Sequence, residues 1–384
     1  MKYTVVVNGR FNAFDYSREL QDRGQLAGLV STMPRKVARK YGISAGLYDG
    51  LPQFELSKRV FRKMFRRELP CEAYAKAFTS TALKRVRDEC DAIVAFAGYA
   101  LEIFESKKCK GKLRVLHRGS THTLENSRLR NEAFQYHGRA YTPLPDSFIA
   151  RELREYEVAD KILVPSTFVY ESFVKNGVNA SKLMLNPYGC SLHRFRDAES
   201  SVGSESSDEN VILFVGQVCE RKGIGVLVRA VELVSQVRPC TKLRVVGAIA
   251  KGCRKFLQSE VVDYAGVLGP KELAAEYRRA SVFVLPSFEE GQANVLLESA
   301  YFGLPIVATR NSGIKDCKLP SGFARICDVG SVDSTVAEIL KALEAPRVVG
   351  HVVTPTWKAF TDRLVKSCSH VENVVQDLRL GDDA

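Results

Sequence analysis

Two glutamates with seven residues between them follow an apolar run in the second half of the chain. Residues 287–308 read SFEEGQANVLLESAYFGLPIVA, with Glu290 in an acidic loop and Glu298 in the helix that the pattern predicts next. Small residues at Gly291 and Ala293 let a ligand approach the backbone, and the free N–H groups of a helix start suit a phosphate. Acidic first turns are also common without any ligand, because the helix dipole favours them.

A second stretch could neutralise the phosphates of such a ligand. Residues 214–223, FVGQVCERKG, put Gly216 at the end of an apolar strand and Arg221 and Lys222 in the loop that follows. Cations in a strand-to-helix loop can offset the charge of a diphosphate. The spacing is neither that of a GxxxxGK[ST] loop nor that of a GxGxxG fingerprint, so this cluster alone is a weak signal.

The elements that must position these residues alternate along both halves of the chain. Apolar strands are predicted at residues 3–7, 26–30, 92–96, 113–117, 161–165, 184–185, 211–215, 243–246, 282–286 and 305–308. Helical patterns lie between many of them, at 16–23, 167–176, 225–236, 271–280 and 293–302. Continuously apolar strands separated by helices indicate α/β domains with parallel sheets covered on both faces.

A polar stretch divides the chain in two. Residues 198–210, AESSVGSESSDEN, are small, polar and acidic and lack apolar periodicity, which is typical of a linker. A length of 384 residues is also that of about two domains. Because open α/β sheets bind ligands at the carboxyl ends of their strands, the cleft between two such domains is the expected site.

Composition and charge exclude several classes of protein. With 45% hydrophobic and 26% charged residues the chain is typical of globular proteins, and no apolar run approaches the roughly 18–20 residues of a membrane-spanning helix. Lys and Arg outnumber Asp and Glu by 34 to 22 in residues 1–200 but equal them, 22 to 22, in residues 201–384. The basic excess predicts either an anionic partner for the first half or a solvated basic surface.

The cysteines and the N-terminus predict a cytoplasmic protein. The ten cysteines are scattered, with no CxxC pair and no Cys/His cluster at metal-ligand spacing, so we expect reduced thiols and no metal site. The opening MKYTVVVNGRFNAF reaches Asn8 and Gly9 too soon to hold the apolar core of a signal peptide.

Together these motifs resemble those of the retaining GT-B glycosyltransferases of family 4, over nearly the whole chain. Glu290 and Glu298 match the family's E-x7-E signature, and residues 215–223 match its VGR…KG loop. The similarity extends to the segments 164–173, 186–195 (NPYGCSLHRF, the interdomain hinge) and the helix at Trp357-Lys358. The resemblance implies two Rossmann-like, doubly wound domains facing a central cleft.

The same resemblance gives each part of the chain a place in that architecture. Residues 1–197 would form the acceptor-side domain, 198–210 the linker and 211–354 the nucleotide-sugar-binding domain. Residues 355–384 would form a C-terminal helix that returns to the first domain.

The resemblance also implies a role for each matching residue. Lys222 would bind the donor's diphosphate and offset the charge on the leaving group. Glu290 would hold hydroxyls of the donor sugar, and Glu298 the nucleotide ribose. Further donor contacts are implied for Gly216, Gln217, Arg221 and Gly291, and for the backbone amides of Gln292, Ala293 and Asn294. The family usually has arginine at the position of Gln217, so one phosphate cation is missing unless Arg221 replaces it.

Two histidines are candidates for the opposite wall of the cleft. In similar enzymes a histidine just after the strand at 113–116 approaches the donor sugar; His117 matches by position, and His122 competes with it in the same loop. A lone histidine is more often structural, but the carboxyl end of a strand facing a cleft favours function.

The acceptor side and the reaction follow from the same resemblance. Gly9 and Arg10 lie in the loop after the first strand, which lacks the family's usual paired glycines, and Arg118 follows His117. The implied reaction is a front-face transfer with retention, in which the leaving diphosphate assists deprotonation of the acceptor. No strand-end DxD motif is present, so no metal is required, and no carboxylate pair suited to double displacement is evident.

One basic segment is separate from these motifs. In residues 56–69, LSKRVFRKMFRREL, helical periodicity puts six cations on one half of the helix and Val60, Phe61, Met64 and Phe65 on the other. The cations are Lys58, Arg59, Arg62, Lys63, Arg66 and Arg67. Such a helix suits an anionic membrane surface; the alternative is a helix packed on the N-terminal sheet with a solvated basic face. No nucleic-acid-binding module is recognised.

We therefore predict a cofactor-independent enzyme that moves a hexose from a nucleotide-sugar, such as a UDP- or GDP-sugar, to a lipid-linked or saccharide acceptor, with possible membrane contact. A sugar-nucleotide epimerase or a phosphorylase would share the fold, but epimerases lack the E-x7-E stretch and no pyridoxal lysine can be identified. A binding protein that has lost catalysis is a third alternative, supported only by Gln217.

Overall fold

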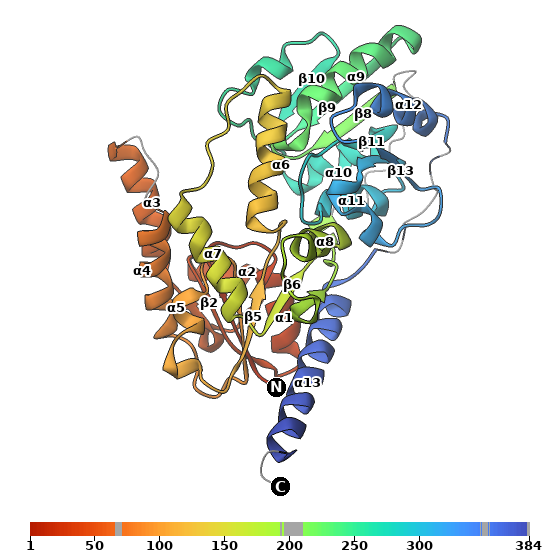
Figure 1. Cartoon of the computed structure of the whole chain (residues 1–384). Helices are drawn as coiled ribbons and strands as arrows, with labels where there is room; N and C mark the ends of the chain where they lie inside the picture. The colour runs from red at the N-terminus through yellow and green to blue at the C-terminus, as the bar shows by residue number, and fades with distance from the viewer. Residues whose placement is uncertain are drawn as a thin grey trace.

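The chain folds around two parallel β-sheets (Figure 1). The computed structural model describes residues 1–65, 71–192, 194–195, 210–345, 347, 352 and 354–381. The first sheet has seven strands in the order β3-β2-β1-β4-β5-β6-β7, and the second has six in the order β10-β9-β8-β11-β12-β13. The predicted α/β class with two doubly wound, Rossmann-like domains is confirmed.

The first sheet lies entirely within the N-terminal half. Its strands are β1 (Tyr3–Val7), β2 (Leu26–Ser31), β3 (Tyr48–Gly50), β4 (Ala92–Phe96), β5 (Leu113–His117), β6 (Lys161–Val164) and β7 (Leu183–Leu185). The helices are α1 (Ala13–Asp22), α2 (Arg35–Lys40), α3 (Pro52–Phe65), α4 (Cys71–Leu83), α5 (Leu101–Phe104), α6 (Thr123–Tyr136), α7 (Asp146–Val158) and α8 (Thr167–Lys175). Val5 and Val7 enter the core on one face and Val6 the core on the other, so β1 is buried throughout.

The second sheet is built in the same way. Its strands are β8 (Asn210–Val215), β9 (Thr241–Val246), β10 (Val262–Gly266), β11 (Val282–Leu285), β12 (Ile306–Thr309) and β13 (Ala324–Cys327). The helices are α9 (Ile224–Val237), α10 (Pro270–Arg279), α11 (Asn294–Tyr301) and α12 (Val332–Leu343). A single large apolar core, which includes Phe214, Phe283 and Tyr277, holds this domain together.

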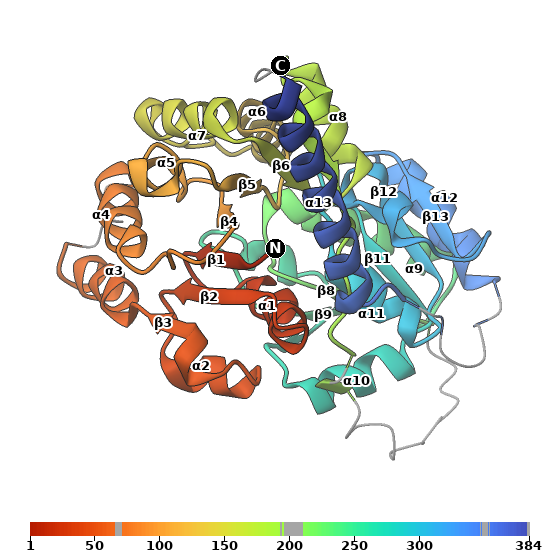
Figure 2. The ribbon, with the colours of Figure 1, turned by 90° about the horizontal axis from the view of Figure 1, so that it is seen from below.

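The long helix α13 (Trp357–Gly381) crosses back to the first domain (Figure 2). Trp357, Phe360 and Leu364 are buried in the core of that domain, and α13 packs on α1. The linker expected at 198–210 falls outside the described residues, apart from Asn210, which begins β8.

The arrangement of strands determines where a ligand can bind. In each sheet the order reverses beside the first strand, between β1 and β4 and between β8 and β11. The loops after these strands therefore border the crevices in which doubly wound sheets bind ligands. Helix α6, which follows β5, reaches across to the second domain and lies against the 3₁₀-helix η5 (Glu220–Lys222) (Figure 1).

Candidate active site

The loop after β8 brings Lys222 to the carboxyl end of the second sheet. Gly216 leaves the strand with a φ of +153°, and a Cβ atom there would lie 3.9 Å from the Lys222 ammonium. Gly223 has a φ of +70° and approaches Pro286 so closely that a Cβ would lie 2.1 Å from the Pro286 carbonyl oxygen. Only glycine fits this close, left-handed position, which joins the loop after β8 to the end of β11.

Lys222 meets a buried cluster of charges from the loop after β11. Its Nζ lies 2.5 Å from Oε1 of Glu290, and Arg221 Nη1 reaches the same oxygen at 2.5 Å. Arg221 also donates to the Glu289 carbonyl at 2.6 Å. Burial opposes ionisation of Glu290, but Lys222 and Arg221 outweigh it and hold the pKa of this carboxyl below its usual value. The two predicted phosphate cations and the first glutamate of the E-x7-E pair therefore converge.

The second glutamate of the pair, Glu298, lies on α11 and faces other partners. Its carboxylate accepts a hydrogen bond of 3.0 Å from the Tyr277 hydroxyl and forms an ion pair with Arg194 of the hinge segment. Burial, with the added charge of Glu298, raises the pKa of Tyr277 well above its usual value, so the phenol remains a donor. Sequence analysis did not single out Arg194 or Tyr277.

The start of α11 is held in place by backbone and side-chain contacts. Ala293 caps the helix without a side-chain hydrogen bond, and its N–H donates to the Ser312 carbonyl at 3.1 Å. The Gln292 side chain is buried and accepts a hydrogen bond of 2.6 Å from the backbone N–H of Tyr188. Asn294 is exposed. Gln292 thus connects the loop to the hinge through its side chain, whereas the resemblance implied only a backbone contact with the donor.

The first domain closes directly on this loop. A Cβ at Gly291 would lie 1.8 Å from the Gly119 carbonyl oxygen, so the backbones of the two domains touch there. The Ser166 hydroxyl donates to the Gly291 carbonyl at 2.6 Å. The Thr121 hydroxyl donates to Glu289 at 3.1 Å, a contact that sequence analysis missed although Glu289 adjoins Glu290. The candidate site is therefore assembled from both domains.

His117 lies beneath this contact rather than in open space. It is buried, with Nε2 3.2 Å from the Tyr188 hydroxyl and its ring centroid 4.2 Å from that of Phe96. Burial lowers the pKa of His117 to about 3, so the imidazole is neutral. In this structure His117 supports the wall of the cleft through Tyr188 and Phe96.

His122 and Arg118 hold the loop that carries Gly119. His122 caps α6, its Nδ1 accepting from the Leu124 N–H, and burial with the nearby Arg118 charge lowers its pKa to about 4. Arg118 is buried against Glu152 at 2.5 Å and donates to the Thr121 carbonyl at 3.1 Å. Both side chains are thus engaged in shaping the loop.

The loop after β1 forms the outer part of the first domain's crevice. Gly9 has a φ of +114°, and its carbonyl accepts a hydrogen bond of 2.7 Å from Ser31. Arg10 is exposed, and Phe11, which sequence analysis did not single out, is 66% exposed. Gln217, at the start of the opposite loop, is also exposed.

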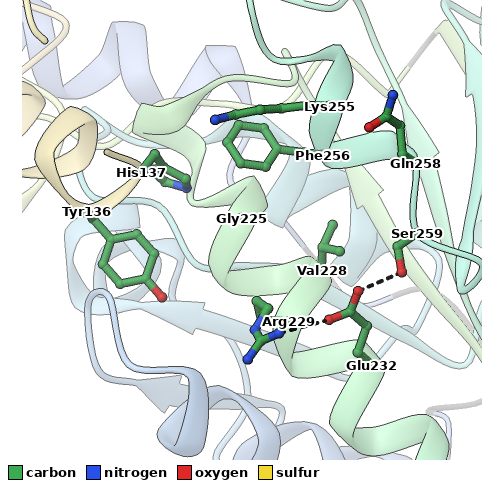
Figure 3. Close-up of a pocket in the computed structure, with 10 residues that line it drawn as sticks. All are labelled: Tyr136, His137, Gly225, Val228, Arg229, Glu232, Lys255, Phe256, Gln258 and Ser259. Carbon is green, nitrogen blue, oxygen red and sulfur yellow. Dashed lines mark hydrogen bonds and ion pairs between the residues drawn. The ribbon is translucent and has the colours of Figure 1, made fainter. Parts of the chain in front are cut away.

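A further contact between the domains lies at the end of α6, beside a cavity of about 560 Å³ (Figure 3). The His137 ring packs on Gly225 of α9 so tightly that a Cβ there would lie 2.5 Å from the imidazole. Arg139 forms an ion pair with the buried Glu220 and donates to the Lys251 carbonyl. The cavity is bordered by α6, α9 and η6 (Arg254–Leu257), apart from the Lys222 cluster.

The basic segment forms a helix, as predicted, but its apolar residues lie differently. Leu56, Val60 and Met64 are 62%, 46% and 68% exposed, so they form a ridge in solvent and do not pack on the sheet. Phe54 takes the inward position instead, edge-on to Phe78. The alternative of a helix whose apolar residues pack on the sheet therefore does not hold for Val60 and Met64, because α3 turns Phe54 and Lys58 inward instead.

The basic residues of α3 divide accordingly. Lys58 points inward and donates to Asn8 Oδ1 at 3.2 Å, whereas Arg59 and Lys63 are exposed. The side chains of Arg62 and Phe65, and residues Arg66 and Arg67 altogether, lie outside the described part of the chain.

Comparisons with known proteins agree with this geometry. Residues 209–345 match the family described as glycosyl transferases group 1. The chain is 31% identical over 183 residues to D-inositol 3-phosphate glycosyltransferase of Pseudarthrobacter chlorophenolicus, covering 43% of each protein. It is 28% identical over 203 residues to lipopolysaccharide 1,2-N-acetylglucosaminetransferase of Salmonella typhimurium, covering 48% of this chain and 53% of that one.

A solved structure extends the likeness in fold to the whole chain. Sucrose-phosphate synthase from Thermosynechococcus elongatus superposes with a TM-score of 0.59 at 15% identity, covering 100% of both chains. The two sequence matches above span only about half of each relative. The chain thus has the GT-B fold, and its residues 209–345 match the family of group 1 glycosyltransferases.

Proposed function

We propose that this protein is a retaining, metal-independent glycosyltransferase that moves a hexose from a nucleotide-sugar to a saccharide or lipid-linked acceptor. One observation carries the proposal: Lys222, Arg221 and Glu290 meet within 2.5 Å beside the first domain's Gly119 loop. A pair of cations at the carboxyl end of β8, Lys222 buried and Arg221 partly exposed, suits a diphosphate, and an adjacent carboxylate suits sugar hydroxyls.

Binding of the donor would replace ion pairs within the protein by contacts to the donor. In the free protein Glu290 pairs with both Lys222 and Arg221, and Glu289 Oε2 lies 3.5 Å from Arg221 Nη1. A bound diphosphate would take over both cations and release Glu290 to accept hydrogen bonds from the sugar. On the nucleotide side, Glu298 would exchange its ion pair with Arg194 for the ribose hydroxyls. Arg221 would supply the charge that the family's arginine provides at the position of Gln217.

The proposed reaction breaks the bond between the anomeric carbon and the diphosphate oxygen. The acceptor hydroxyl attacks from the same face, its proton passes to the departing phosphate oxygen, and the new glycosidic bond keeps the anomeric configuration. Lys222 would stabilise the charge that develops on the leaving group, which is the usual main effect of such positioned cations. The neutral, buried His117 would act as a positioning residue behind Gly119.

Two alternative functions are compatible with the same cleft. A protein that binds nucleotide-sugars without turning them over is favoured by the missing arginine at Gln217, and an epimerase is compatible with the fold alone. A screen of UDP-, GDP- and ADP-sugars by thermal shift, followed by an assay of nucleotide release with and without acceptor, distinguishes them. We expect one donor to raise the melting temperature, because it binds only the folded state.

A variant of the proposed site and a matched control variant show whether the activity depends on Glu290. Glu290→Ala should lower both nucleotide release and sugar transfer, whereas Glu338→Ala on α12, far along the chain from the cluster, should not. Binding without release by the wild type would favour the non-catalytic alternative. Release that is equal in wild type and Glu290→Ala would contradict the site assignment.

We also propose that the protein is cytoplasmic and contacts an anionic membrane surface through α3. The support is the exposed ridge of Leu56, Val60 and Met64 flanked by the exposed cations Arg59 and Lys63. Apolar side chains beside cations suit the boundary between headgroups and acyl chains. No helix among the described residues is long and apolar enough to cross a bilayer.

Vesicle flotation tests this contact. The protein should float with vesicles that contain phosphatidylglycerol, less at high salt, and not with phosphatidylcholine alone. Val60→Glu with Met64→Glu should abolish flotation, whereas Val237→Glu, at an equally exposed apolar position on α9, should not. Flotation of the double variant at the wild-type level would contradict the assignment of α3.

A further inference from the structure

Phe11 holds an unusual conformation at the carboxyl end of β1. Its φ is +40°, a left-handed value that is unfavourable for a bulky side chain, yet the ring is 66% exposed. The ring stacks on Phe96 at a centroid distance of 5.8 Å and an interplanar angle of 24°, and Phe96 in turn covers His117. Backbone strain that leaves an aromatic ring in solvent is concentrated at functional sites.

Asn8, three residues earlier, is a buried amide with an unused donor. Its Oδ1 accepts from Lys58 Nζ at 3.2 Å and from the Tyr74 hydroxyl at 3.3 Å. Its Nδ2 is buried and has no hydrogen-bond partner among the described residues. Leaving a buried donor unpaired costs about 1–3 kcal/mol, so its presence calls for an explanation.

Lys58 adds a positive charge to the same place. Asn8 and the Tyr74 ring, whose centroid lies 4.4 Å from Nζ, hold the ammonium at the inner side of α3. The exposed Arg10 stands between Asn8 and Phe11 in the chain. The end of β1 therefore combines donors and cations with a flat apolar surface.

This combination fits one kind of ligand. Phosphate oxygens accept charge-assisted hydrogen bonds from ammonium and amide groups, and an aromatic ring packs on the apolar face of a sugar or on an acyl chain. We propose that Phe11 and Lys58, positioned by Asn8, form a subsite for an acceptor that carries a phosphate group. This inference rests on the proposed function and names the class of its acceptor.

Two sources could supply such a phosphate, a soluble sugar phosphate or a phospholipid headgroup. Matched pairs of probes distinguish them: glucose against glucose 6-phosphate, and diacylglycerol against phosphatidic acid in vesicles that all contain phosphatidylglycerol, so that contact through α3 is present in both. Binding of each probe is measured with the full chain, in parallel with binding of the donor found in the thermal-shift screen. The phosphorylated member of at least one pair should bind about tenfold more tightly than its partner, as expected for one charge-assisted contact.

Variants then assign that preference to residues. Lys58→Met should abolish the preference for phosphate, while Lys76→Met, an exposed lysine on the neighbouring α4, should retain it. Phe11→Ala should weaken binding of both members of the pair, and Phe11→Tyr should restore it. Donor binding should stay unchanged in all four variants, which separates the loss of this subsite from misfolding.

The outcomes separate this inference from the proposed function. If no nucleotide-sugar binds the wild type, the proposed function fails, whatever the phosphate probes show. If the donor binds but neither pair shows a preference for phosphate, or Lys76→Met loses it as fully as Lys58→Met, the subsite is refuted.

Discussion

Lys222 and Glu290 form an ion pair in the free protein. Their 2.5 Å contact, which Arg221 shares at the same Glu290 oxygen, gives the largely buried Lys222 ammonium a partner that would be costly to lose. The same contact keeps both side chains at the positions where a diphosphate and a sugar would meet them. A ligand that offers phosphate to one and hydroxyls to the other can replace the ion pair without leaving either group unsatisfied.

Removing the lysine tests its assigned role in the transition state. Lys222→Met should lower the transfer rate at saturating donor by at least about a hundredfold, the range found for removing one transition-state donor. Lys271→Met, an exposed lysine on α10, is the matched control and should retain the wild-type rate. Steady-state kinetics check this, and an unchanged rate in Lys222→Met would rule out the leaving-group role.

The two buried histidines predict a loss of stability in acid. The pKa is lowered to about 3 for His117 and about 4 for His122, so the unfolded chain binds protons that the folded chain excludes. Their contribution is full above about pH 6.5 and decreases as the pH falls, by about 2 kcal/mol per histidine at about pH 5.

The measurement is the melting temperature as a function of pH. In His117→Phe, which keeps the ring stacking but cannot titrate, the fall between about pH 6.5 and 5 should be shallower than in the wild type. The curves are compared by slope, because the variant also leaves the Tyr16 and Tyr188 hydroxyls without a ring nitrogen. Parallel curves would show that His117 is not protonated on unfolding in this range.

At the scale of elements, helix α6 of the first domain packs against the second domain. Ala133 packs with Val226 and Phe288 of the second domain, and the His137 ring sits on Gly225. The contact between the two domains here therefore requires glycine at position 225, because a side chain there would collide with the His137 ring.

Gly225→Ala tests whether this contact matters, because helix propensity and the contact with His137 predict opposite changes in stability. In an exposed helix the change would stabilise by up to about 1 kcal/mol. Here the new Cβ would lie 2.5 Å from His137, so we expect destabilisation of about 1–3 kcal/mol, as in overpacked cores, and a lower melting temperature. Gly46→Ala, where nothing lies within 4 Å, is the control. A melting temperature of Gly225→Ala equal to or above that of the wild type would contradict the tight contact between His137 and Gly225.

Sequence patterns predicted the strands that are buried throughout and missed some of those that are partly exposed. Strands such as β1 and β8 are mostly apolar because both faces are covered, which makes them easy to recognise. By contrast, β10 and β13 are partly exposed, so their composition resembles that of loops. Helix α6, TLENSRLRNEAFQY, has no strong apolar stripe, because it bridges two domains mostly through its C-terminal end.

The part of the site that could be predicted is the part that lies in loops directly after predicted strands. Lys222, Arg221 and Glu290 lie in loops after adjacent strands, so parallel topology alone brings them together. Contacts that depend on closure, such as Thr121 with Glu289 or Arg194 with Glu298, join segments far apart in sequence and leave no local pattern. The two alternatives for α3 stayed open for a similar reason, since periodicity does not say which side of a helix packs on the protein.

At the scale of the whole molecule, the two domains meet through backbone as well as side chains. Gly119 touches Gly291, Ser166 and Thr167 bond to the second domain, and α13 returns from the second domain to the first. The molecule is thus held in a closed arrangement in which the loops after β5, β8 and β11 face one another. That arrangement is what a transferase needs to exclude water from an activated sugar.

The most direct test of the account is a crystal structure of the protein with the nucleotide-sugar that stabilises it most. We predict that the diphosphate lies within hydrogen-bond distance of Lys222 Nζ and that the Lys222–Glu290 contact is replaced by contacts to the donor. Density for the donor far from Lys222, or an unbroken Lys222–Glu290 pair beside a bound donor, would contradict it.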